Sequence, residues 1–73
     1  ACPLRVVAAD TARTPHERVV AAALAFEALG DDAALPLLEE ALALVTDADA
    51  TGVLADLAVV APQVAAALEP LPA

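Results

Sequence analysis

The stretch TPHERVVAAALAFEALG, residues 14–30, decides the fold of this chain, because it holds a helix start signal and a helix stop signal. Thr14, followed three residues later by Glu17, forms a capping box. Pro15 stands at the first helical position, where its missing N–H has no helical partner to lose. Gly30 supplies the left-handed residue that ends many helices. We therefore predict a helix over 15–29.

This predicted helix is apolar around most of its circumference. Between Val19 and Leu29, the only charged side chain is Glu27. A helix that is apolar on all sides is buried on all sides. Part of it must therefore be covered by other segments of the chain or by another protein.

Other helical patterns run along the rest of the sequence. Residues 4–10 contain two β-branched valines and also fit a short strand, but we favour a helix near 4–12. Apolar spacing predicts a third helix over 32–45, and TDADATG (46–52) then breaks the pattern. Pro62 divides the last apolar stretch, which predicts either a kink or two short helices, near 52–61 and 62–69, before a tail at 70–73.

The fold class that follows is all-α, in a single small domain of residues 1–73. Three to five helices joined by short links form a compact antiparallel helical bundle, or α-hairpin array. We expect the packing and interaction surfaces to be built from the larger apolar side chains, which are Val19, Val20, Leu24, Phe26, Leu38, Leu42, Leu57, Val60 and Val64.

The composition sets the stability of such a bundle. Of the 73 residues 62% are apolar, but most of these are Ala, Val and Leu, and Phe26 is the only aromatic. Each buried CH₂ contributes about 0.8 kcal/mol, so an alanine-rich core stabilises less than a leucine-rich core. We therefore expect a bundle that gains from self-association or from a protein partner.

The charge distribution narrows the class of partner. The chain carries eleven acids and three arginines, a net charge of −8. Residues 1–18 hold all three arginines against two acids, whereas residues 19–73 hold nine acids and no base. Such a surface repels phosphate backbones and anionic lipid, so we expect no nucleic-acid binding and no membrane binding. Solubility alone accounts for the acids; the alternative is a basic partner surface.

Source and location are inferred from what the sequence lacks. It has no Lys, Ile, Met, Asn, Ser, Tyr or Trp, which favours a bacterium with a GC-rich genome. Because it has no initiator Met, we expect a processed chain or a segment of a larger protein. No apolar run reaches the roughly 18 residues of a membrane span, and no signal peptide is visible, so we expect a cytoplasmic protein.

Candidate chemistry is sparse. His16 is the only histidine, and an exposed position at a helix start explains it better than a catalytic or metal-binding role. Cys2 has no local base, so we assign it no function. Asp47, Asp49 and Thr51 alternate as in a calcium loop, but the closing glutamate is absent. We expect no enzyme activity, no cofactor and no metal.

One stretch resembles a known family. In AFEALGDDAALPLLEEALAL (25–44), Gly30 and Asp31 match the turn of a tetratricopeptide repeat, Ala34 its small packing position, and the pairs at 37–38 and 41–42 its large and closing residues. The resemblance implies a helical-hairpin scaffold for protein–protein contact and no chemistry. The family's groove residues are not matched, so none is carried over.

The function that we predict is a non-catalytic helical protein–protein interaction or dimerisation module, with a protein partner or a second copy of the chain as its ligand. The alternative is a membrane-active helical peptide similar to the circular bacteriocins, which are also small Ala/Val/Leu-rich bundles. The net charge of −8 argues against that alternative, because binding to anionic bilayers favours basic faces.

Overall fold

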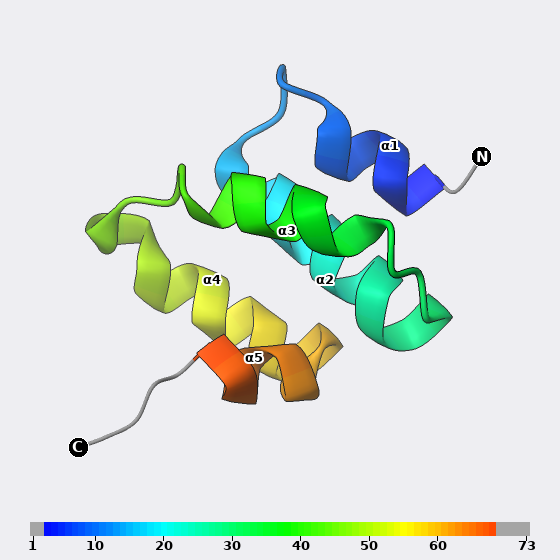
Figure 1. Cartoon of the computed structure of the whole chain (residues 1–73). Helices are drawn as coiled ribbons and strands as arrows, with labels where there is room; N and C mark the ends of the chain where they lie inside the picture. The colour runs from blue at the N-terminus through cyan, green and yellow to red at the C-terminus, as the bar shows by residue number, and fades with distance from the viewer. Residues whose placement is uncertain (1–2, 69–73) are drawn as a thin grey trace.

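All regular structure in the described residues is helical, as Figure 1 shows for a computed structural model that describes residues 3–68. The helices are α1 (Pro3–Ala9), α2 (Pro15–Leu29), α3 (Ala34–Leu42), α4 (Asp47–Val60) and α5 (Pro62–Leu68). The all-α bundle is confirmed, and the N-terminal segment is a helix rather than a strand. The predicted tail at 70–73 and the last residue of the predicted helix 62–69 lie outside the described residues.

The local signals at both ends of α2 act as predicted. The Thr14 hydroxyl accepts a hydrogen bond from the Glu17 N–H, and the Glu17 carboxylate accepts one from the Thr14 N–H, at 3.2 and 3.1 Å. Gly30 ends the helix in the left-handed region, at φ 65° and ψ 27°. Both ends of α2 are thus fixed by neighbouring residues in the sequence.

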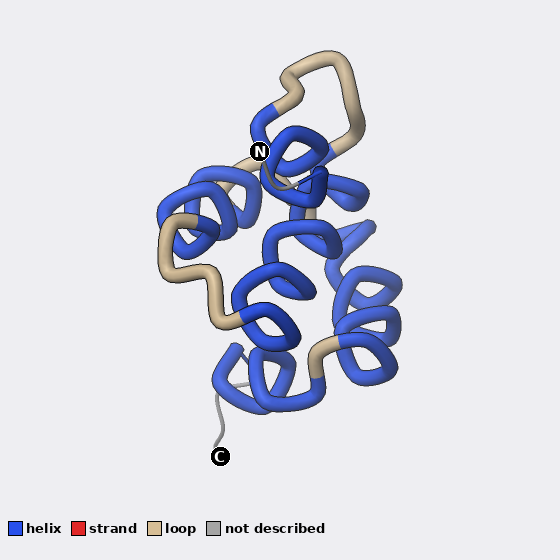
Figure 2. The backbone as a smooth tube through the Cα atoms, turned by 90° about the vertical axis from the view of Figure 1, so that its right-hand side faces the viewer, coloured by secondary structure: helices blue, strands red, loops and turns tan. Residues whose placement is uncertain are grey.

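Helix α2 is the centre of the bundle, and the other four helices pack around it (Figures 1 and 2). α1 and α3 also contact each other, and α4 contacts α5. By contrast, α3 has no Cα atom within 8 Å of α4 or α5, although α3 and α4 are consecutive. The apolar circumference of α2 is therefore covered by four separate helices.

Alanine dominates the core. Apart from Val19, α2 contributes only alanines to the buried apolar set, and its neighbours add several more. The largest fully buried side chains are Val19, Val53 and Leu57. The buried alanines are Ala8, Ala21, Ala22, Ala23, Ala25, Ala34, Ala41, Ala61 and Ala65.

One buried charge joins three helices. Arg18 of α2 is 3% exposed, and its Nε donates to the Ala8 carbonyl of α1 at 2.9 Å. Its Nη2 lies 3.2 Å from Oε1 of Glu40 on α3. The guanidinium thus satisfies a carbonyl near the C-terminal end of α1, where a positive charge is favoured by the helix dipole.

Helix α4 begins earlier than the sequence pattern predicts. The expected break at 46–52 is wrong, since α4 starts at Asp47 and continues through Gly52. Thr46 is extended, at φ −84° and ψ 162°, and Asp47 and Asp49 occupy the first turn. Acidic residues there stabilise the positive end of the helix dipole, so the acids that suggested a loop are a helix start.

Three other predicted boundaries shift by a few residues. α1 ends at Ala9 instead of residue 12, because the Asp10 side chain accepts the Ala12 N–H at 2.9 Å and turns the chain. α3 spans Ala34–Leu42 instead of 32–45. At Pro62 the choice between a kink and two helices is settled: α4 stops at Val60, and α5 begins with the proline.

Candidate functional site

The predicted packing residues fall into two groups. Val19, Leu38, Leu57 and Val64 are buried. The others are only partly buried, and most of them pack against the edge of the core: Val20, Leu24, Phe26, Leu42 and Val60. Three members of the second group, Val20, Leu24 and Phe26, lie on α2 and line depressions of the surface.

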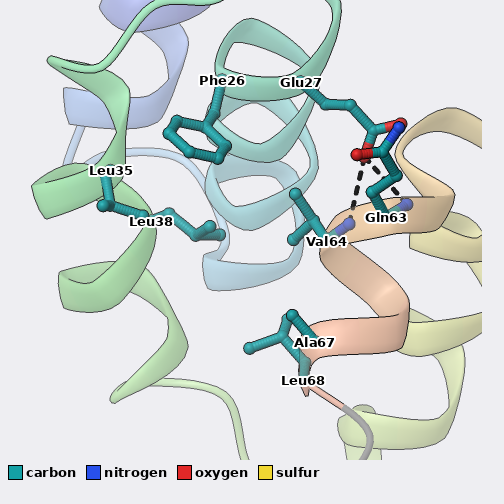
Figure 3. Close-up of a pocket in the computed structure, with 8 residues that line it drawn as sticks. All are labelled: Phe26, Glu27, Leu35, Leu38, Gln63, Val64, Ala67 and Leu68. Atoms are coloured by element: carbon teal, nitrogen blue, oxygen red, sulfur yellow. Dashed lines mark hydrogen bonds between the residues drawn. The ribbon is translucent and has the colours of Figure 1, made fainter.

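The larger of these places is a groove between α2, α3 and α5, with a volume of about 430 Å³. Helices α3 and α5 form its opposite walls, with no Cα atoms of the two helices within 8 Å of each other, and the C-terminal part of α2 lies between them (Figure 3). We call this the α2–α3–α5 groove. It is lined by Phe26, Glu27, Leu35, Leu38, Gln63, Val64, Ala67 and Leu68.

The apolar lining of the groove is graded from floor to mouth. Leu38 and Val64 are buried, at 3% and 8% exposure. Phe26 is partly buried, and Figure 3 shows its ring on the side of the groove that faces α3. Leu35 is 39% exposed, and Ala67 is also exposed. The one aromatic side chain of the protein thus lines an open groove instead of filling the core.

The polar edge of the groove is made by Glu27. Its Oε1 accepts the backbone N–H groups of Gln63 and Val64, at 2.9 and 3.0 Å (Figure 3). These are the second and third residues of α5, so a carboxylate of α2 caps the N-terminus of another helix. The groove therefore depends on Glu27, which holds α5 in place as one wall.

The basic side chains of the chain are all engaged away from the groove. Arg5 of α1 lies 2.7 Å from Asp31 Oδ2, and Arg13 lies 3.6 Å from both Asp10 and Glu17. Arg18 pairs with Glu40, as described above. No base therefore lines the groove.

A second, shallower depression lies nearer the start of α2, between α1 and α4. It is lined by Leu4, His16, Glu17, Val20, Ala21, Leu24 and Asp56. His16 Nε2 donates to Asp56 Oδ2 at 2.5 Å and so joins the start of α2 to α4. His16 is the second residue of α2, as expected, and its side chain is 38% exposed, but it also has a partner 40 residues away, which no local pattern indicates.

The acids that alternate as in a calcium loop form no metal-binding cluster in the described residues. Among residues 3–68, no group of three or more His, Cys, Asp or Glu side chains is placed to hold a metal ion. Asp47, Asp49 and Thr51 lie in the first turns of α4, and Asp49 Oδ2 accepts from the Thr46 hydroxyl at 3.2 Å. Cys2 lies outside the described residues.

None of the helices in residues 3–68 has the length and apolar character needed to cross a membrane. Comparison of the chain with protein-family models, curated proteins and solved structures gives no match. A functional proposal therefore has to be based on the structure, and we base it on the α2–α3–α5 groove.

Proposed function

We propose that this chain is a non-catalytic protein-binding module, and that the α2–α3–α5 groove receives apolar side chains of a partner protein. The observation that carries the proposal is the position of Phe26, the only aromatic residue, in the lining of an open groove beside the exposed Leu35. Burying apolar surface contributes about 25 cal/mol per Å². A partner that fills the groove gains this free energy.

The shape of the groove supports the same proposal. Aromatic residues in well-packed pockets are enriched among the few residues that dominate binding energy in protein interfaces. The floor of the groove is formed by Leu38 and Val64, which are buried in the fold. The mouth, at Leu35 and Ala67, is open to solvent.

A site-specific crosslinking experiment tests the proposal. A photoreactive amino acid replaces Leu35 at the groove mouth in one variant, and Val59 in a matched control variant. Val59 is 81% exposed and does not line the groove. Each variant is irradiated in an extract of the cells that produce the protein, and the crosslinked protein is purified and titrated against the unmodified chain.

We expect one partner to crosslink at position 35 and not at position 59. The purified partner should bind the wild-type chain, and an Ala67→Glu variant should weaken that binding without loss of helical structure, because Ala67 is exposed. Equal crosslinking at both positions would show non-specific contact and contradict the proposal. So would a partner whose affinity is unchanged by Ala67→Glu.

A further inference from the structure

We infer that the occupant of the α2–α3–α5 groove is a basic amphipathic helix of a partner protein. Its apolar side chains enter the groove, and its Lys and Arg side chains face the acidic surface around it. This inference rests on the proposed function and adds the class of partner. Three observations support it: the secondary structure around the groove, the polar atoms already engaged there, and the charge of the residues that build it.

A helical occupant fits the polar atoms of the groove. Residues 3–68 contain no strand edge to which an extended peptide could add its backbone hydrogen bonds. Of the two polar side chains that line the groove, Glu27 already accepts two N–H groups of α5. A helix satisfies its own backbone and needs only an apolar face for such a groove, with anchors at helical spacing.

The charge of the groove's surroundings selects a basic occupant. Every residue that lines the groove comes from 19–68, a segment with eight acids and no base. Glu39 is exposed and follows Leu35 by four residues, which places both on one face of α3. A partner carboxylate beside Leu35 would be repelled by the Glu39 carboxylate, whereas an ammonium or guanidinium group there would be attracted to it.

A second copy of the chain is the less suitable occupant. Two copies at a net charge of −8 each repel one another at low ionic strength, and this repulsion slows their association. The same field accelerates the approach of a cationic partner. A second copy of the chain and a basic partner therefore differ in charge, and an experiment can distinguish them by this difference.

The test uses three synthetic peptides as probes. The first is an amphipathic helix with a leucine stripe flanked by Lys and Arg. The second has the same stripe flanked by Glu, and the third is a scrambled form of the first, with equal charge and no apolar face. Each is titrated into the full isotope-labelled chain, and the backbone resonances and affinity are followed by NMR at low and high salt.

We expect the basic amphipathic peptide to bind about tenfold or more tightly than the Glu-flanked peptide, with a difference that shrinks as salt is added. The shifted resonances should include those of Leu35, Leu38 and Ala67. The scrambled peptide, which has the same charge, should bind more weakly because it presents no apolar face.

Two variants of equal net charge then show which acidic residue attracts the basic peptide. Glu39→Gln removes one acid at the groove rim, and Asp47→Asn removes one acid at the start of α4, outside the groove lining. Both residues are exposed. We expect Glu39→Gln to weaken the basic peptide about two- to fivefold, and Asp47→Asn to leave its affinity nearly unchanged.

Several results would overturn the inference. Equal affinity for the basic and acidic peptides would show that charge does not select the partner. Equal loss of affinity for the basic peptide in Glu39→Gln and Asp47→Asn would show that Glu39 has no special role in binding. Shifts confined to the depression at Leu4, Val20 and Leu24 would place the site elsewhere. A dimer that forms through the groove at low salt would make the occupant a second copy.

The proposed function can survive such a failure. If none of the peptides binds, but a partner crosslinks at position 35 and is weakened by Ala67→Glu, the groove is a protein-binding site and only the class of partner is wrong. If the crosslinking also fails, both proposals are wrong.

Discussion

Replacing Glu27 by alanine tests how the smallest wall of the groove is held in place. Helix α5 has seven residues, too few to form a stable helix alone. The Glu27 carboxylate accepts the N–H groups of Gln63 and Val64. Alanine is as good a helix former as glutamate, so the substitution leaves α2 intact and removes only the cap of α5.

The size of the effect follows from the surroundings of the two donors. The Gln63 N–H is exposed and regains water, so its lost bond costs about 0.5 kcal/mol, at the low end for hydrogen bonds. The Val64 N–H is partly buried, and losing a charged acceptor there costs about 1.5 kcal/mol. Glu27→Ala should therefore lower the free energy of unfolding by about 2 kcal/mol, and the Tm by about 8–16 °C. Glu27→Gln keeps a neutral acceptor and should lose about half as much.

The assay is urea unfolding followed by circular dichroism, since the chain has no Trp or Tyr to report by fluorescence. Amide hydrogen exchange adds a local readout, and we expect the α5 amides to lose protection before those of α2. Glu39→Ala is the matched control, because Glu39 is an exposed helical glutamate. If Glu27→Ala unfolds at the same urea concentration as Glu39→Ala, with α5 still protected, Glu27 does not hold α5.

Three further substitutions test the rest of the fold by thermal unfolding. Arg18→Met should lower the free energy of unfolding by about 2 kcal/mol, since it leaves the Ala8 carbonyl without its donor, and hydrogen exchange should show α1 loosened first; protected α1 amides would contradict this. Leu57→Ala opens a cavity at a fully buried site and should cost about 2–5 kcal/mol, against less than about 0.5 kcal/mol for the exposed Val59→Ala. Gly30→Ala should cost about 1–2 kcal/mol through backbone strain alone, because an added Cβ meets nothing within 4 Å; an unchanged Tm would refute that reading.

Local sequence signals predicted the parts of the fold that depend on neighbouring residues. Thr14, Glu17 and Gly30 fix both ends of α2, and all three act within one turn of the helix. Pro62 likewise ends one helix and begins the next. Such interactions are readable because their partners are close in the chain.

The start of α4 shows where the same reasoning fails. Asp, Thr and Gly over 46–52 indicate a loop by composition, yet Thr46 followed by Asp47 and Asp49 is also a helix start. Composition alone does not distinguish these two structures. The helix is stabilised by the acidic residues at its N-terminus. It is also stabilised by its later turns, which bury Val53 and Leu57 in the core.

The candidate site was beyond sequence reasoning for a different reason. The sequence predicts that the larger apolar residues pack together, and it shows that Phe26 is the only aromatic residue. It does not show that Phe26 lines a groove. The groove depends on the distance between α3 and α5 and on the contact of Glu27 with α5, whose partners lie 36 and 37 residues apart in sequence. In the sequence Glu27 stands out as the only charged residue between Val19 and Leu29, but nothing in the sequence indicates its contact with α5.

The alanines at the centre of the bundle have a consequence for entropy. An alanine side chain has no rotamers to lose on folding, whereas a buried leucine loses about 0.5–1 kcal/mol of conformational freedom. The small hydrophobic gain of this core is therefore opposed by a small ordering cost. The alanines of this core also have no rotamer to change when a neighbouring side chain is enlarged. Ala22 and Ala23 are fully buried, so a larger side chain at either position has to be accommodated mainly by displacement of the neighbouring backbone.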